Sequence, residues 1–596
     1  MFVSPSVPAM RRTTLSMRVL ALVACFEFVD AGGHTCAELG CGRHDATCWC
    51  APSCWSHRDC CEDYATTCPQ PVSKATLRDL NFVVTTDLHS WIEGRVHEPH
   101  FNATLGHATS FVERLKALAR PKRKDVFFFD NGDINDGTGL SAIRQDHVER
   151  VAPLMRTAPY DALNLGNHEL YQLDSHGAIA GKPCAVAGLR DSGYISFWGG
   201  HYLTSNTVWA GSDEAVGSRY VTLEGEFGTR LLVFGFLYNM EDHCDAVEVQ
   251  DVASVVNATW FLKALREHAP VSDAIVVLAH MDYRDALVDV ILKAIRGVAG
   301  AMKPVQFLTG HSHIRGWRRL DDFASSFEAG CKLDTVGFVS MDRASSHRLY
   351  FDYVDIDGNT ALLAGAANTS ESELPEPVGD AVNAAIVATR ASLALGEEIG
   401  CATQRYRTRV ALEDAESLWA YYMRRVVPSV LFDAKPVRAQ WALVGTGALT
   451  YDIYPGPFTL DDAYQVSPYG NFWFVLRNIS GGVLTAALES LNTGVAAREL
   501  DLHNSFLLGG RSLSSRAVPD YVATGPADPS AFYDAIYCDF DAAAFEGEVR
   551  ERSGAPLQPE IFHVGSNTSS VLADWFRTQQ CPPSSGMVAA GPSIVI

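Results

Sequence analysis

The 596-residue sequence lacks a surplus of positive charge, because 48 Lys and Arg face 70 Asp and Glu, for a formal net charge of −22. Proteins that wrap nucleic-acid polymers carry a basic footprint, so this composition argues against such a partner. A small anionic substrate remains compatible with it, since a metal ion can reverse the local field. After the first 33 residues no apolar run reaches the roughly 18 residues of a membrane helix, so no transmembrane segment is expected.

The chain begins with the features of an export signal. Arg11, Arg12 and Arg18 precede the apolar run 19–26, and small residues follow at 31–33. We therefore expect residues 1–32 to be a signal peptide and the protein to be secreted. The tail 583–596 is apolar but short, which leaves a lipid-anchor signal open. Five sequons fit a secreted glycoprotein: those at Asn102, Asn257, Asn368, Asn478 and Asn567.

Eight of the 15 cysteines crowd into the short interval 36–68. So few residues cannot bury a sufficient core, and disulfides are expected to supply the stability. Zinc binding is the alternative, but the adjacent Cys60 and Cys61 fit a zinc finger poorly. The runs Cys48-Trp49-Cys50 and Asp59-Cys60-Cys61-Glu62 resemble a somatomedin B domain. This resemblance implies a disulfide-rich module over 33–70 that docks an extracellular protein partner.

Six further cysteines lie outside the signal and this module, and none stands in a nucleophile motif. Their even number allows three more disulfides in an oxidising compartment. They are Cys184, Cys244, Cys331, Cys401, Cys538 and Cys581.

The rest of the chain is too long for one core and indicates two large domains. Residues 75–365 alternate short apolar runs with helical patterns, such as those at 109–119 and 257–268, as a layered α/β domain does. A stretch rich in Ser, Glu and Pro predicts a linker at 366–395. A second α/β domain is expected at 396–582.

Five apolar, strand-like runs in the first large domain each end in residues that bind metals. The runs are 82–86, 126–129, 162–165, 275–279 and 305–309. They lead respectively into Asp87-Leu88-His89, Asp130-Asn131-Gly132-Asp133, Gly166-Asn167-His168-Glu169, His280, and Gly310-His311-Ser312-His313.

Continuous apolar runs suit strands that are covered on both faces, and ligands of such sheets bind beyond the carboxyl ends of the strands. Residues two apart on an extended segment point the same way, so Asp87 can converge with His89 and His311 with His313. Imidazole, carboxylate and amide ligands suit Zn, Mn or Fe. Seven candidates exceed the needs of one tetrahedral ion but fit two divalent ions about 3.5–4 Å apart.

In this order, the five blocks resemble the calcineurin-like metallophosphoesterase superfamily. The resemblance implies a layered β-sandwich flanked by helices and a hydroxide, activated by two metals, that attacks a phosphate ester. By this resemblance, His168 would be the catalytic imidazole, and Asn167 would serve both the metal site and catalysis. One metal would be held by Asp87, His89, Asp133 and His313, and the other by Asp133, Asn167, His280 and His311.

The C-terminal half resembles the second domain of 5'-nucleotidases, through Gly456-Pro457-Phe458 and Ser467-Pro468-Tyr469-Gly470-Asn471. Two positions depart from that family. Thr450 stands where an Arg helps to hold substrate, and Tyr171 replaces an Asp that orients the catalytic His. Candidates for the aromatic contacts to a nucleobase are Tyr469, Phe472, Trp473 and Phe506.

The resemblance within the superfamily is nearest to a fungal-type 5'-nucleotidase-like group, through Asp136-Gly137-Thr138-Gly139 and Gly166-Asn167-His168-Glu169. It implies hydrolysis of nucleotides or similar small phosphate esters. The altered Thr450 supports a phosphodiesterase or pyrophosphatase as an alternative. A third hypothesis is an inactive extracellular binding protein that works through its somatomedin B-like module.

Overall fold

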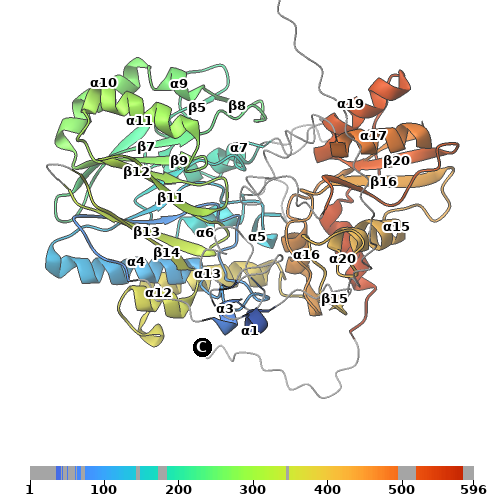
Figure 1. Ribbon diagram of the computed structural model, residues 1–596, viewed down its shortest axis with the longest axis horizontal. Coiled ribbons are helices and arrows are strands. Elements are labelled where there is room, and N and C mark those ends of the chain that lie inside the picture. The colour runs from blue at the N-terminus through green and yellow to red at the C-terminus, as the bar shows by residue number, and fades with distance from the viewer. Residues whose placement is uncertain are drawn as a thin grey trace, which may run out of the picture.

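The computed structural model describes residues 35–39, 41, 43, 50, 61, 64–68, 74–142, 148–171, 184–343, 348–493 and 518–581 (Figure 1). The expected signal peptide and the tail lie outside these residues, as does Phe506. Within the part of the chain that is described, no helix combines the length and apolar character needed to cross a membrane.

A sandwich of two six-stranded sheets forms the first large domain (Figure 1). One sheet has the order β14-β13-β1-β2-β3-β4 and the other β11-β12-β10-β9-β7-β6. The strands of the first are β1 (Leu80–Thr85), β2 (Phe127–Asp130), β3 (Ala162–Asn164), β4 (Tyr202–Leu203), β13 (Thr335–Met341) and β14 (Phe351–Asp357). Those of the second are β6 (Tyr220–Glu224), β7 (Arg230–Leu237), β9 (Ala274–His280), β10 (Val305–Thr309), β11 (Arg315–Asp321) and β12 (Ala324–Ala329).

Helices cover the outer faces, which gives four layers and confirms the layered α/β prediction (Figure 1). Phe82 and Val84 of β1 pack between the sheets, whereas Val83 packs outward under the helices. Because both faces of these strands are buried, their sequences are continuously apolar. On the outer face of the second sheet lie α10 (Thr259–His268) and α11 (Ala286–Ala299).

Helix α4 (Leu105–Ala119) covers the other sheet and begins four residues before the helix expected at 109. Thr104 caps it, accepting from the backbone N–H of His107, whose ring returns the contact to Thr104. A His at the third position is unlike the usual Glu or Gln, which hid this capping box from the sequence pattern.

The segment expected as a linker contains α13 (Pro377–Ser392), which packs against α4. The two helices approach closely at Gly106 and Gly379, where an added Cβ atom would collide with the other helix. Pro377 suits the first turn, since the missing N–H of proline needs no partner there. The limits predicted for the domains and the linker stay predictions.

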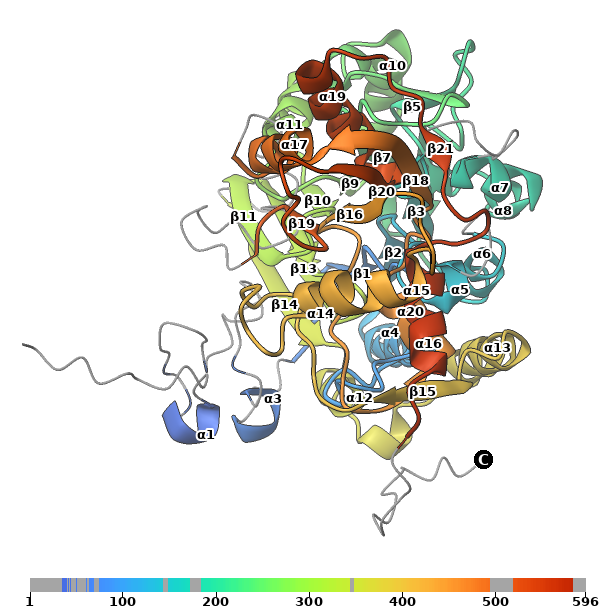
Figure 2. The ribbon, with the colours of Figure 1, turned by 90° about the vertical axis from the view of Figure 1, so that its right-hand side faces the viewer.

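A five-stranded sheet of order β19-β16-β20-β18-β21 forms the core of the second domain (Figure 2). Its strands are β16 (Ala439–Gly445), β18 (Trp473–Ser480), β19 (Tyr521–Ala523), β20 (Phe532–Cys538) and β21 (Glu560–Ile561). One face packs on α17 (Gly481–Thr493) and α19 (Ala542–Ser553). The other packs on α14 (Leu418–Tyr421) and α20 (Thr568–Arg577).

Four disulfides join described cysteines, and two of them lie in the large domains: Cys184–Cys244 and Cys401–Cys581. The expectation of a third pair is wrong, because Cys331 and Cys538 form no disulfide. Cys538 ends β20 in the second domain, whereas Cys331 lies between β12 and β13 of the sandwich, and both are buried.

Only part of the predicted somatomedin B-like module is described. Short helices α1 (Cys36–Leu39) and α3 (Tyr64–Thr67) lie apart from the layers of both large domains (Figure 2). Disulfides Cys36–Cys50 and Cys41–Cys68 link this region. The disulfide-rich character is thus confirmed, while the resemblance to somatomedin B stays a prediction.

Candidate metal centre

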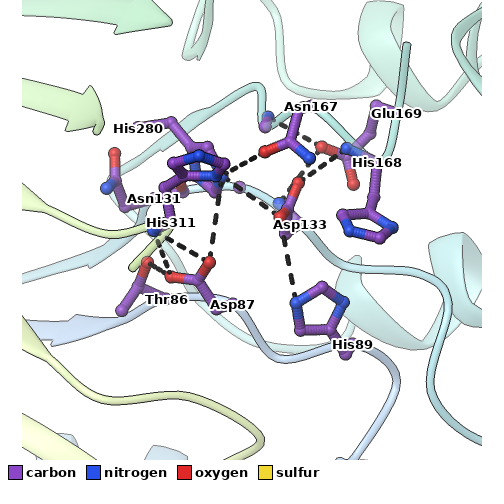
Figure 3. A network of polar contacts seen from close by, with 12 residues as sticks. Thr86, Asp87, His89, Asn131, Asp133, Asn167, His168, Glu169, His280 and His311 are labelled. Carbon is purple, nitrogen blue, oxygen red and sulfur yellow. Dashed lines mark hydrogen bonds and ion pairs between the residues drawn. The ribbon is translucent and has the colours of Figure 1, made fainter. Parts of the chain in front are cut away.

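All seven predicted ligands converge at one edge of the sandwich, and Figure 3 labels six of them, all except His313. Strands β1, β2 and β3 run parallel in one sheet, and β9 and β10 run parallel in the other. Their carboxyl ends therefore meet at a common edge, where open sheets bind ligands. The converging side chains are Asp87, His89, Asp133, Asn167, His280, His311 and His313.

The first cluster comprises Asp87, His89, Asp133 and His313, whose ligand atoms all lie within 4.8 Å of one another. His89 Nε2 is 3.0 Å from His313 Nε2, and His313 Nε2 is 3.3 Å from Asp87 Oδ1. At this distance the two nitrogens either share a proton or face one cation together. This donor set fits a transition metal.

A second cluster shares Asp133 with the first and adds His280 and His311. His280 Nε2 lies 3.1 Å from Asp133 Oδ2 and 3.0 Å from Asn167 Oδ1 (Figure 3). The Asn167 amide nitrogen donates to the Tyr171 hydroxyl at 3.0 Å, so its oxygen faces the cluster. A carboxylate shared by two ligand sets is the arrangement that two neighbouring cations require.

Backbone carbonyls fix which imidazole nitrogens face the clusters. His89 Nδ1 lies 2.9 Å from the carbonyl oxygen of Asn135, and His280 Nδ1 lies 2.8 Å from that of Asn131. A carbonyl oxygen can only accept, so each Nδ1 carries a proton, and Nε2 is the ring nitrogen left to bind a metal once it is unprotonated. These residues therefore fit a bound metal in ring orientation as well as in position.

Buried charges interact strongly at this edge. Burial alone would raise the pKa of Asp87, but His280 and His313 lower it to about 2. Burial opposes protonation of His280, yet Asp133 and Asp87 raise its pKa to about 10. Burial, reinforced by neighbouring imidazoles, lowers the pKa of His89 to about 3. The cluster gathers imidazoles and carboxylates away from water, an arrangement that recurs at functional sites.

The backbone is strained at five of the seven candidates. Asp87 has φ of 51°, His89 46°, Asp133 56°, His311 74° and His313 60°, all in the left-handed region. Such conformations cost about 1–3 kcal/mol each for residues other than glycine and persist where the surrounding structure imposes them. The strain is concentrated where the side chains must point at one place.

Glu169 is a residue whose role the sequence did not reveal. Its carboxylate accepts from the backbone N–H groups of Asp133 at 3.1 Å, Ile134 at 2.7 Å and Gly166 at 2.7 Å. It thereby joins the loops after β2 and β3. Gly166 allows the close approach, since a Cβ atom there would collide with the Asp133 carboxylate.

A carboxylate does orient His168, although it is not at the position expected from the sequence. Asp136 Oδ2 lies 2.8 Å from His168 Nδ1, and Tyr171 contacts the same ring edge-on. Burial lowers the pKa of His168, but Asp133 and Asp136 outweigh it and raise the value. Asp136 stands in the Asp136-Gly137-Thr138-Gly139 motif, so its presence was visible, but not its proximity to His168.

The aromatic candidates divide clearly. The Tyr469 ring is stacked near His168, with centroids 6.0 Å apart and planes at 24°. Trp473 is fully buried in the core of the second domain. Trp473 is therefore a packing residue, and Tyr469 is the aromatic side chain of this set that stands at the metal centre.

Comparisons with known proteins agree with this geometry. Residues 80–315 match the family model for calcineurin-like phosphoesterases, and residues 404–539 match the model for the C-terminal domain of NAD nucleotidase. An uncharacterized protein of Schizosaccharomyces pombe is 26% identical over 455 residues, covering 71% of this chain and 74% of the relative. A protein of Arthroderma benhamiae named "Secreted protein" is 24% identical over 491 residues, covering 74% and 72%.

Among solved structures, the 5'-nucleotidase from Candida albicans matches with a TM-score of 0.75 at 22% identity. The match covers 85% of this chain and 99% of the Candida chain, and at this identity it shows a shared fold. The chain thus joins a calcineurin-like phosphoesterase domain to a nucleotidase-type C-terminal domain, and it is a metal-dependent phosphoester hydrolase.

Proposed function

We propose that the protein is a secreted hydrolase that uses two divalent cations to cleave nucleotides or similar small phosphate esters. The observation that carries this proposal is the shared Asp133, which belongs to both ligand clusters. One ion is held by Asp87, His89, Asp133 and His313. The other is held by Asp133, Asn167, His280 and His311.

The chemistry of the donors favours Zn, Mn or Fe. When bound, such a pair of cations polarises a phosphate group and lowers the pKa of a water molecule. The protein's own contribution is to hold the ligand atoms in place and to exclude bulk water, since Asp87 and His280 are fully buried.

His168 acts on the substrate directly in this proposal. Its Nδ1 is engaged by Asp136, which leaves Nε2 to donate to a phosphate oxygen or to the leaving group. Its backbone N–H donates to Asp133 Oδ1 at 2.8 Å, which ties the catalytic imidazole to the shared ligand. A positioned donor of this kind stabilises the charge that develops in the transition state.

The substrate class is supported by the second domain, whose match is to a nucleotidase-type model. Tyr469 offers an aromatic face beside His168. The Thr450 side chain carries no positive charge with which to hold a phosphate, and its hydroxyl donates to the Gln465 carbonyl oxygen at 3.3 Å. Monoesters and diesters must therefore be compared in one assay, and a strict preference for diesters would contradict a 5'-nucleotidase activity.

Secretion is supported by the disulfides Cys184–Cys244 and Cys401–Cys581 and by the name of the Arthroderma benhamiae relative. Disulfides of this kind persist in oxidising compartments. The same proposal gives the disulfide-rich module a docking role, in which it binds an extracellular protein. Binding measurements with the isolated secreted protein would test this role.

The shared ligand provides the test. Asp133→Asn should lower the metal content from two ions per chain and reduce phosphate release by roughly 100- to 1000-fold. The matched control is Asp130→Asn, because Asp130 is a neighbouring buried carboxyl group that belongs to neither ligand cluster, and burial raises its pKa to about 8. A folded wild-type protein with two bound metals that is inert on nucleotides, sugar phosphates and simple diesters would overturn the proposal.

A further inference from the structure

The loop that carries Asp136 reaches the boundary between the two domains. Asp136 has φ of 68°, and its backbone N–H donates to Ser141 Oγ at 3.0 Å. Ser141 lies in α5 (Gly139–Ala142), which contacts α16 (Leu460–Val466) of the second domain (Figure 1). The loop 136–141 therefore links the catalytic imidazole at one end to the second domain at the other.

Asp461 makes this link with a single buried hydrogen bond. Its Oδ1 accepts from the backbone N–H of Gly139 at 2.7 Å, and its side chain is almost fully buried. Its Oδ2 accepts from Arg390 at 2.6 Å and from Gln465 at 2.9 Å. The lack of a side chain at Gly139 allows this close approach, because a Cβ atom would lie 2.9 Å from Asp461 Oδ1 and 2.3 Å from Leu395 Cδ2.

We infer that Asp461 is a positioning residue: it holds Gly139 and so fixes the loop that sets Asp136 against His168. A buried N–H group needs an acceptor, and within the described residues the acceptor of Gly139 comes from the other domain. The imidazole is then correctly oriented only while the two domains keep this arrangement. The inference rests on the proposed function, because that proposal gives His168 its catalytic role.

An interdomain hydrogen bond outside this loop supplies a matched control. The Tyr451 hydroxyl donates to Glu98 Oε2 at 2.9 Å, also across the boundary and in a half-buried place. Tyr451→Phe removes one interdomain hydrogen bond and leaves loop 136–141 unchanged. Asp461→Asn retains an oxygen for Gly139, whereas Asp461→Ala removes it.

Hydrogen exchange tests the structural half of the inference without any substrate. In the full-length, metal-loaded protein, amide exchange in residues 136–142 should rise at least about tenfold in Asp461→Ala, because the Gly139 amide loses its acceptor. Tyr451→Phe should not change it, and Asp461→Asn should keep most of the protection. Equal exchange in Asp461→Ala and wild type would overturn the inference, as would equal loosening by Tyr451→Phe.

Kinetics test the catalytic half. Asp136→Asn and Asp461→Ala should each lower kcat about 10- to 100-fold on a nucleoside 5'-monophosphate, with little change in KM or metal content. The loss should be smaller on p-nitrophenyl phosphate, whose leaving group needs no proton. The double variant should be no worse than Asp136→Asn alone, and additive losses would overturn the inference. A wild-type protein inert on all phosphates would refute the proposed function instead, while hydrogen exchange still tests the loop.

Discussion

The N-terminal sandwich and the C-terminal domain differ in where they place buried charge and strained backbone. In the sandwich, carboxylates and imidazoles from five strand ends converge on one place, most of them in left-handed conformations. In the described part of 396–581, only Asn478 and His563 have such a conformation among residues other than glycine, and both lie far from each other in the chain. Charged groups there form ion pairs within the domain, as Asp534 does with Arg438 and Arg477.

This difference separates the candidate metal centre from a domain that is stable through ordinary packing. Strain and crowded charge persist only where the surrounding structure imposes them, so they indicate function in the first domain. The second domain contributes through its boundary, where Asp461 accepts from Gly139 and the Tyr469 ring lies near the His168 ring. Substitutions at the candidate metal centre should therefore change activity most, and substitutions in the core of the second domain should change stability most.

The largest expected effect is on the stability of the second domain. Trp419 is fully buried in its core, and Trp419→Ala should lower the free energy of unfolding by about 3–5 kcal/mol. Denaturant unfolding followed by fluorescence measures this change. Val437 in the same domain is 92% exposed, and Val437→Ala should stay within about 0.5 kcal/mol. Comparable losses in both variants would contradict the assigned core.

In the sandwich the large effect is expected on activity. His280→Asn should reduce kcat by roughly 100- to 1000-fold, because a ligand of the second cluster that also contacts Asn167 is lost. The melting temperature of the metal-free protein should fall as well, because the buried carboxylates of Asp87 and Asp133 lose their pairing with the His280 imidazolium. Thermal unfolding in the presence of a chelator checks this; an unchanged melting temperature would contradict the pairing.

The pH dependence of stability should reveal one buried carboxyl group of the second domain. Burial raises the pKa of Asp541 to about 7, although the hydrogen bond that its carboxyl group accepts from the Gly445 backbone N–H opposes the shift. The folded state therefore binds a proton that the unfolded state releases between the ordinary value of 3.8 and about 7. The stability from this group is fully present below pH 3.8 and is lost as the pH rises to 7.

Asp541→Asn should remove this dependence, so that the variant gains stability relative to wild type between pH 4 and pH 8. We expect a gain of roughly 2 kcal/mol, because relaxation around the carboxylate reduces the ideal value of about 1.4 kcal/mol per pKa unit. Parallel unfolding curves for both proteins at several pH values would measure it. A pH-independent difference between the two proteins would count against the assignment.

The smallest expected effect is the difference between the stability losses caused by removing each of the two long-range disulfides. Cys401–Cys581 spans 180 residues of sequence and Cys184–Cys244 spans 60. In the chain-entropy account, removal of the longer link should destabilise by roughly 1 kcal/mol more than removal of the shorter one. Double Cys→Ser variants of each pair, unfolded in denaturant, provide the measurement. The reverse order would show that local packing around the sulfur atoms outweighs loop entropy.

Much of the candidate site follows from the sequence because its ligands obey local rules. Apolar runs predicted β1, β2, β3, β9 and β10, and polar residues directly after them had to lie at one edge of the sheets. The pairing of Asp136 with His168 could not be found in this way, because the two residues come from loops after different strands. Tyr171 is a misleading signal, because the carboxylate that orients His168 comes from the loop after β2 and not from the position three residues after His168.

Other expectations failed for similar reasons. An even count of cysteines allowed three more disulfides, but Cys331 and Cys538 are buried in different domains and form none. Trp473 carried no sign in the sequence that its ring points into the core of the second domain rather than toward the metal centre.

By itself the sequence determined the class of domain and the chemistry of the ligands, because strand periodicity and donor type are properties of short segments. Only the tertiary structure decided that Asp136 lies against His168 and that Asp461 accepts a hydrogen bond from Gly139 of the same loop. Each of these depends on distances between segments that are remote in the chain, which are set by how the layers and the two domains pack.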